Sequence, residues 1–183
     1  MKIKILTHAA SILIMFLLAS LIIQSCKKGN DTPANNTSNS TYYCNANING
    51  SAWKADRVLA GDTSNLLIAL GIKIANSDTS LFTIVFPDNI TVNQLTTFDQ
   101  AQNSVLVFAM QSSNGGATNI YSMDPSAGGS GDFTITKLDV SAKVVEGNFN
   151  GEAVNTTNKN DKLTITNGKF SMPYIVGKPT TKI

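Results

Sequence analysis

Strict alternation of apolar and polar residues marks several segments of the chain. Residues 42–48 alternate in this way, with Cys44 on the apolar side, and the pattern ends at Asn49-Gly50. Residues 144–153 also alternate and present one polar face. A period of two residues is typical of β-strands that bury one face, so both segments are predicted to be strands.

Three further segments are apolar on both faces: Leu66–Ile74, Leu81–Phe86 and Val105–Met110. Such runs are typical of strands that are covered on two sides. Either these are central strands with something packed over them, or one face is an exposed apolar patch that meets a partner or ligand. Coverage by neighbouring loops is the more common arrangement, and we expect it here.

The last predicted strands flank Asn167-Gly168, a pair that favours a two-residue hairpin turn because both positions then need positive φ. A hairpin there would pair Ile165 with Phe170 and keep both on one face. No apolar pattern of helical period extends over ten residues in this region. We therefore expect residues 42–176 to form an all-β domain of about nine to ten antiparallel strands, either a sandwich or a flattened barrel.

The N-terminal region has a different pattern. Lys2 and Lys4 precede an apolar run at 9–23, which is shorter than the roughly 20 residues of a transmembrane helix. Its length fits the core of a secretion signal, although an uncleaved anchor helix is the alternative. The run ends just before Ser25-Cys26, which resembles the cleavage site of bacterial lipoproteins. Residues 1–25 are then a signal peptide, and Cys26 becomes a lipidated N-terminus.

A polar stretch separates this cysteine from the β-domain. Residues 26–41 are rich in Asn, Ser, Thr and Gly and are predicted to be a disordered tether, and 177–183 a C-terminal tail. Lys27–Asp31 resembles the short charged export signal of surface lipoproteins of Bacteroidota. We expect the lipid to hold the protein on the outer membrane, on either its periplasmic or its cell-surface side.

Charge and composition exclude several classes of function. Removal of the signal peptide leaves 12 basic residues against 12 acidic ones and removes His8, the only histidine. A neutral domain gives no reason to expect nucleic-acid binding. Without histidine, Ser-His-Asp, Cys-His and zinc-hydrolase sites are excluded from the mature chain. Cys44 is predicted to be a small buried hydrophobe, and the sequence contains no motif for a metal or a cofactor.

Other catalytic patterns are weak. Ser51–Lys54 matches S-x-x-K but lacks its partner motifs, and a turn between strands explains it better. Gly128–Asp132 is not a nucleophile elbow and is predicted to be a flexible loop. Glu146 and Glu152 lie about 20 Å apart along one strand, which is too far for a glycosidase pair. A carboxylate site would have to be assembled by folding from other acids, for instance Asp132, Asp139 and Asp161.

Three aromatic residues near the tether are the candidate binding residues. Exposed rings of Trp53, Tyr42 and Tyr43 would stack on sugar faces or anchor a partner. For Trp53, the flanking alanines favour packing in the core instead.

A resemblance to a protein family adds to this picture. Ile48–Ala55 reads I-N-G-x-x-W-x-A, which is similar to the opening of a group of uncharacterised Bacteroidota lipoproteins. Gly131–Thr136, Gly147–Phe149 and Ile165–Phe170, the last reading I-T-N-G-K-F, resemble the C-terminal half of that group. The resemblance covers most of Tyr42 to Tyr174. It implies a lipid-anchored β-domain of unknown function and no catalytic residues.

Together these patterns predict a non-enzymatic, lipid-anchored envelope module that interacts with a protein or glycan partner. A carrier or binder of a small apolar ligand or a glycan is the alternative, and a hydrolase using only carboxylates is a third. A barrel with an unfilled interior would favour the carrier, whereas a packed sandwich would count against it.

Overall fold

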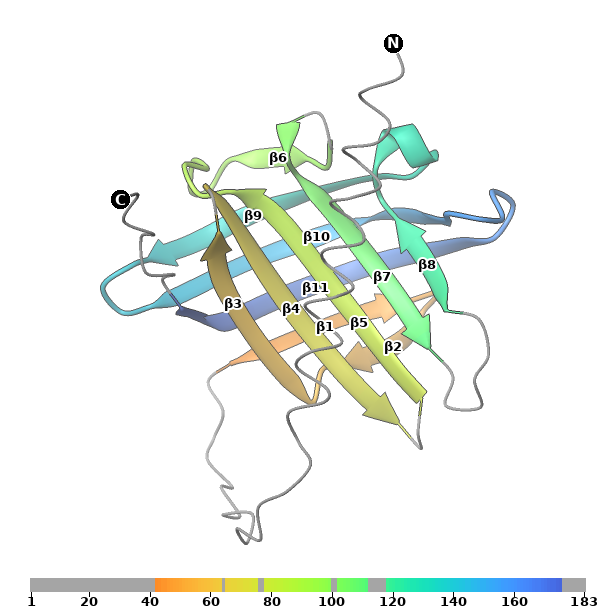
Figure 1. Cartoon of the computed structure of the whole chain (residues 1–183), viewed down its shortest axis with the longest axis horizontal. Helices are drawn as coiled ribbons and strands as arrows, with labels where there is room; N and C mark the ends of the chain where they lie inside the picture. Colours follow the sequence, from red (N-terminus) through yellow and green to blue (C-terminus); the bar gives the residue numbers. More distant parts are fainter. Residues whose placement is uncertain (1–41, 64, 76–77, 100–101, 112–117, 176–183) are drawn as a thin grey trace, which may run out of the picture. The chain divides into compact units, whose positions relative to one another are not determined.

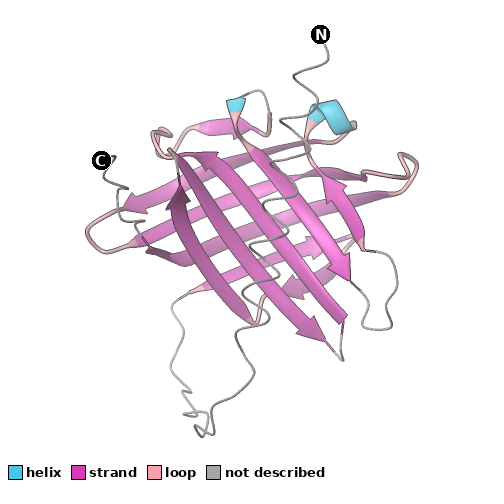
Figure 2. Cartoon of the chain, in the orientation of Figure 1, coloured by secondary structure: helices cyan, strands magenta, loops and turns pink. Residues whose placement is uncertain are grey.

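The computed structural model describes residues 42–63, 65–75, 78–99, 102–111 and 118–175, and this part of the chain is almost entirely β-strand (Figure 2). The predicted signal peptide, Cys26, the tether and the C-terminal tail lie outside the described residues. The elements are β1 (Tyr43–Ile48), β2 (Ser51–Lys54), β3 (Arg57–Thr63), β4 (Leu66–Ala75), β5 (Asp78–Pro87), β6 (Leu95–Thr97), β7 (Val105–Gln111), β8 (Asn119–Ser122), the short 3-10 helix η2 (Pro125–Ala127), β9 (Ser130–Asp139), β10 (Val144–Asn155) and β11 (Lys162–Ile175).

The strands form one curled sheet that folds over into two layers. One layer has the order β2-β1-β11-β10-β9-β6 and the other the order β3-β4-β5-β7-β8. The layers join where β10 pairs with β8 through Val154 and Ser122, and where β11 pairs in parallel with β3 through Tyr174 and Ala60. Figure 1 shows the strands of the second layer crossing those of the first at a steep angle. The predicted all-β sandwich or flattened barrel is confirmed.

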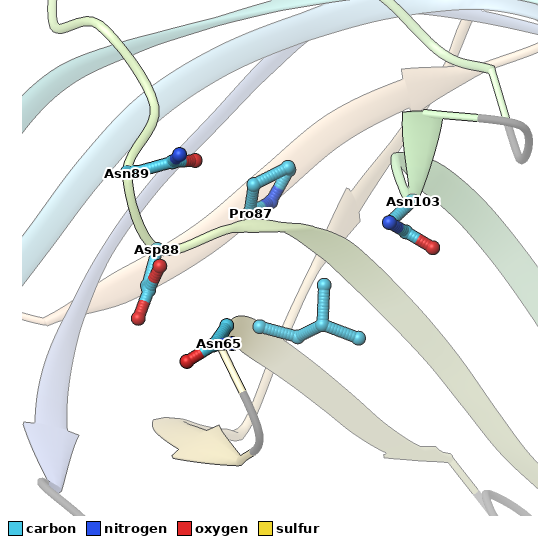
Figure 3. A pocket seen from close by; sticks show the side chains of 6 residues that line it. Asn65, Pro87, Asp88, Asn89 and Asn103 are labelled. Atoms are coloured by element: carbon cyan, nitrogen blue, oxygen red, sulfur yellow. The ribbon is translucent and has the colours of Figure 1, made fainter.

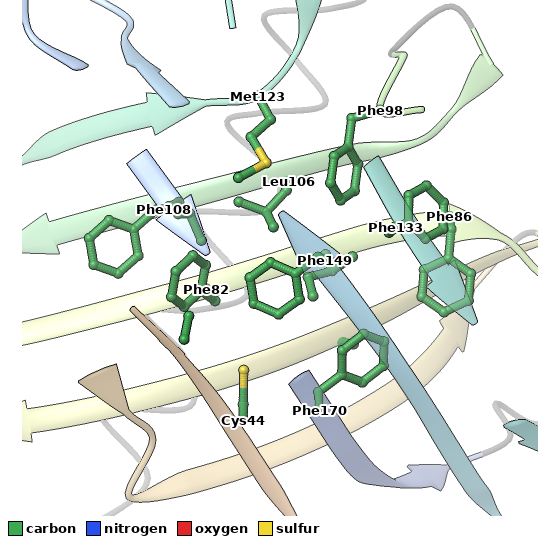
Figure 4. Packing of buried hydrophobic residues seen from close by; sticks show 14 of the residues in the cluster. Cys44, Phe82, Phe86, Phe98, Leu106, Phe108, Met123, Phe133, Phe149 and Phe170 are labelled. Atoms are coloured by element: carbon green, nitrogen blue, oxygen red, sulfur yellow. The ribbon is translucent and has the colours of Figure 1, made fainter. Parts of the chain in front are cut away.

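The space between the layers is filled by side chains. Alternation along each strand sends every second residue inward, as predicted from the period of two. Figure 4 shows rings from both layers meeting there, with Met123 and Cys44 beside them. The fully buried aromatic side chains are Phe82, Phe86, Phe98, Phe108, Phe133, Phe149 and Phe170. The packed interior argues against a carrier that encloses its ligand between the layers.

Two asparagine-glycine pairs that look alike in sequence have different roles. Asn49 and Gly50 have φ of 49° and 80°, and they connect β1 to β2 in a hairpin that pairs Ile48 with Ser51. A strand is therefore confirmed to end there, and the two-residue loop has the positive φ angles that a tight hairpin needs.

The hairpin predicted at Asn167-Gly168 is wrong, because β11 continues through this pair. Asn167 has φ of 53° and forms a bulge, and its backbone N–H donates to Asn150 Oδ1 at 2.9 Å. Ile165 pairs with Ile48 on one side of β11, so it does not pair with Phe170. Strands on both flanks of β11 supply its partners, and this long-range pairing overrides the local turn signal.

Two further local expectations also change. Ser51–Lys54 is the strand β2 and not only a turn. Within Gly128–Asp132, Ser130 begins β9, so the segment is only partly a loop. Gly131 lies so close to its neighbours that a Cβ there would be 2.6 Å from Met123 Sδ. Close packing of the backbone therefore accounts for a glycine that the sequence alone assigns to flexibility.

Candidate functional site

The outward face of the layer β3-β4-β5-β7-β8 is lined mainly by apolar side chains. Its side chains alternate with those of the core and align in rows across the strands, because the pairing register is continuous. Most of them are half-buried, and the central Thr83 and Val85 are buried. The aliphatic members of the face are Leu59, Leu66, Ile68, Leu70, Ile72, Ile74, Leu81, Val85, Val105, Val107, Ala109 and Ile120.

Charge is nearly missing from this apolar face. Among the outward-facing residues of these five strands in the described ranges, Arg57 is the only charged one, and it aligns with Ile72 and Leu81. Five strands at a spacing of about 4.8 Å and about six residues of strand length give a face of roughly 400 Å². This value is the outline of the face, and the apolar area open to a partner is smaller because most of its side chains are half-buried.

The outward face of the other layer is polar by comparison. One row across its six strands contains one apolar side chain, at the edge strand β6, and consists of Lys54, Asn45, Lys169, Asn148, Thr134 and Leu95. Neighbouring positions on β10 carry Glu146, Asn150 and Glu152. The domain therefore presents one water-compatible face and one apolar face, whereas the apolar runs in the sequence favoured coverage of such a face by neighbouring loops.

A cavity of about 370 Å³ opens at one end of the two layers. Its apolar wall consists of Ile48, Trp53, Phe108 and Met110 from β1, β2 and β7. Trp53 donates its indole N–H to Ser80 Oγ at 2.8 Å and packs edge-on against Phe82, with ring centroids 4.7 Å apart. An apolar wall with a few polar groups is the usual character of a small-molecule site.

The rim of this end cavity is polar. Lys73, Asp78, Gln111 and Asn119 line it at the ends of four strands. Sequence reasoning did not identify these residues, because only the tertiary fold decides which strand ends meet. One signal was available: Lys73 interrupts the apolar run of β4 at an inward position.

The three candidate aromatic residues are not brought together. Trp53 faces inward and is 6% exposed, so it is part of the core and presents little ring surface to the cavity. Tyr43 faces outward on the polar layer, where it pairs with Ser171 and is 37% exposed. Tyr42 is half-buried before the start of β1. These positions do not form a shared stacking platform.

A second cavity, of about 490 Å³, lies at the ends of β4 and β5 and is lined mainly by amide side chains (Figure 3). Asn65 and Asn103 have φ of 69° and 59°, a conformation that asparagine tolerates better than most residues. Among the described residues that line it, Asp88 is the only carboxylate, and its backbone N–H donates to the Asn65 carbonyl at 3.0 Å. Turn geometry explains these asparagines without a ligand.

The carboxylates do not converge. Asp132 and Asp139 lie seven residues apart on β9, or about 23 Å at the rise of a strand. Asp161 Oδ2 accepts hydrogen bonds from Tyr121 Oη at 2.8 Å and Asn155 Nδ2 at 3.0 Å. Burial, and then the hydrogen bond to Asp161, raises the pKa of Tyr121. Across the described ranges, no three His, Cys, Asp or Glu side chains gather in a way that would hold a metal.

Glu152 and the thiol of Cys44 have structural roles. Glu152 forms an ion pair with Lys162 at 2.8 Å on the exposed face of β10. Cys44 is completely buried, and burial raises its pKa to about 12. The thiol is therefore protonated at neutral pH and is not a nucleophile.

Comparisons with models of protein families, with curated proteins and with solved structures find no match for this chain. Within the described residues, no helix has the length and hydrophobicity of a membrane span.

Proposed function

We propose that this protein is an outer-membrane lipoprotein whose β-domain is a non-enzymatic interaction module. The observation that carries the proposal is the contrast between the two outward faces of the domain. One face is polar, and the other is mainly aliphatic, with Arg57 as the one charged side chain among its described residues. An aliphatic face of roughly 400 Å² is a surface that a partner covers, and the chemistry available at it is binding.

The anchor part of this proposal is supported by the sequence. The apolar run at 9–23 and the Ser25-Cys26 site resemble a lipoprotein signal, and the I-N-G-x-x-W-x-A segment resembles Bacteroidota lipoproteins. Two or three acyl chains on Cys26 would hold the domain stably, since burial contributes about 0.8 kcal/mol per CH₂.

Metabolic labelling with an alkyne fatty acid tests the anchor. Wild-type protein is expected to acquire the label, and Cys26→Ala is expected to lose it. Equal labelling of the two proteins would reject lipidation at this residue, and Cys44 does not confuse the result because it is buried.

Photo-crosslinking in intact cells tests the interaction surface. A photoreactive amino acid replaces Leu70, in the middle of the apolar face, or Asn148, in the middle of the polar face. The proposal expects adducts with protein or lipid from position 70 and far fewer from position 148. Equal yields from both positions would contradict it.

A second candidate function is the binding of a small apolar ligand or a glycan in the end cavity. The cavity favours it because an apolar wall lies beneath a polar rim of Lys73, Asp78, Gln111 and Asn119. Trp53 is the only tryptophan, so its emission reports this cavity directly. Saturable emission changes with a medium-chain fatty acid or a monosaccharide would support the function, if they are lost in Met110→Lys. An unchanged spectrum up to millimolar ligand would dismiss it.

A further inference from the structure

The apolar outward face can be assigned a specific occupant, and the assignment rests on the proposed lipid anchor. Its charge pattern is the first argument. The face carries aliphatic side chains over five strands, no acidic side chain among its described outward positions, and one cation, Arg57, near one end of the face. An aliphatic surface without acidic side chains enters the boundary between headgroups and acyl chains without burying a negative charge.

The place where the tether joins the domain is the second argument. β1 begins at Tyr43, which pairs with Ser171 of β11. Three residues further along, Tyr174 of β11 pairs with Ala60 of β3, the outermost strand of the apolar layer. The tether therefore joins the domain beside the corner at which the apolar face begins.

The length of the tether is the third argument. Fifteen residues separate Cys26 from Tyr42. Fully extended, 15 residues span at most about 54 Å. This covalent limit allows the face to meet the same bilayer that holds a lipid attached at Cys26.

From these three observations we propose that the aliphatic face of β3, β4, β5, β7 and β8 lies on the lipid bilayer that holds the acylated Cys26. The contact lays the domain flat on the membrane and turns the polar face, with Asn148 and Lys169, toward the aqueous phase. The tether then sets the location of the domain, and the face sets its orientation.

Lipid-dependent quenching of a fluorophore tests the proposal on the mature, lipidated protein. Leu70→Cys and, as the matched control, Asn148→Cys are each labelled with an NBD maleimide. Cys44 is buried and Cys26 is alkylated, so the introduced thiol is the one that reacts. The proteins are reconstituted in vesicles of phosphatidylethanolamine and phosphatidylglycerol, with and without lipids that carry a nitroxide on the acyl chain.

We expect about threefold stronger quenching at position 70 than at position 148, because an interfacial contact buries the face about 5 to 10 Å into the headgroup and acyl boundary. Ile68→Glu in the labelled Leu70→Cys protein should remove most of the quenching. Thr166→Glu, on the polar face, should leave it unchanged. Circular dichroism checks that both variants fold, because Ile68 is half-buried whereas Thr166 is exposed.

Three outcomes overturn the proposal. Equal quenching at positions 70 and 148 means that the domain has no preferred orientation on the lipid. Fluorescence at position 70 that depends on protein density, and not on nitroxide lipid, means that a second copy covers the face. A blue-shifted label at position 70 that nitroxide lipids do not quench means that polypeptide covers it. Loss of fatty-acid labelling at Cys26 would instead refute the proposed function on which the inference rests.

Discussion

Phe82 lies at the centre of the contact between the two layers, and its removal is the most direct test of the packing. Its side chain is fully buried on β5. The ring centroid lies 4.5 Å from that of Phe108 on the same layer, and 4.7 Å and 5.3 Å from those of Trp53 and Phe149 on the other layer. Phe82→Ala therefore removes one ring from three aromatic contacts. Leu81→Ala, one residue earlier on the outward face, is the matched control.

The expected costs of the two substitutions differ several-fold. Truncating a buried phenylalanine to alanine costs about 3 to 5 kcal/mol, and the rigid aromatic neighbours here favour the upper half because they cannot close the cavity. Truncating the half-buried Leu81 costs about 1 kcal/mol, since the apolar area returned to water is small. At about 3 to 5 °C per kcal/mol for a domain of this size, Phe82→Ala should lower Tm by about 12 to 25 °C.

Urea and thermal unfolding, followed by circular dichroism, measure both variants against wild type. Trp53 emission provides a second probe of the same transition, with a new baseline in Phe82→Ala because the two rings are in contact. A loss for Phe82→Ala no larger than that for Leu81→Ala would refute the assignment of inward and outward faces on β5. The same result would remove the basis for an apolar outward face.

The remaining predictions concern a close contact, the thiol and one carboxylate. Gly71→Ala should cost about 1 to 3 kcal/mol in urea unfolding, because the new Cβ would lie 2.8 Å from Cys44 Cβ and overpack the core; an unchanged midpoint would contradict this. Cys44 should resist iodoacetamide at pH 8 in the native protein and react after unfolding, because burial raises its pKa to about 12; rapid native alkylation would show that the site opens. The Asp139 carboxylate accepts hydrogen bonds from Ala142 N and Ser141 Oγ, both at 2.7 Å, and these lower its pKa from the ordinary 3.8. Its contribution to stability is therefore present above about pH 4 and is lost as the pH falls through the folded-state pKa. Asp139→Asn should flatten the dependence of the unfolding free energy on pH between 4 and 2, and an identical dependence in both proteins would argue against the turn contacts.

The all-β class of the domain could be predicted from the sequence because the alternation of apolar and polar residues is a local property. Each strand that is buried on one face repeats every two residues, and the runs at Leu66–Ile74, Leu81–Phe86 and Val105–Met110 all lie within strands of the structure. The Asn49-Gly50 turn was also readable, because it joins two strands that are adjacent in sequence.

Pairing between distant strands could not be read in this way. Asn167-Gly168 has the same local chemistry as Asn49-Gly50, yet it forms a bulge because β1 and β10 flank it on both sides. The end cavity depends on the meeting of Lys73 and Asn119, which are far apart in the chain. Local propensity is weaker than the hydrogen bonds and burial that a complete sheet provides, so such pairs follow the tertiary structure.

The sequence by itself therefore determined that residues after Tyr42 form strands, that Cys44 lies on an apolar side, and that His8 is the only histidine. It also predicts the lipid anchor at Cys26, which labelling will test. Only the tertiary structure decided which side of each doubly apolar strand faces the core. The period of two marks two faces without telling which one meets the other layer, and packing of Phe82 against Phe149 makes that choice.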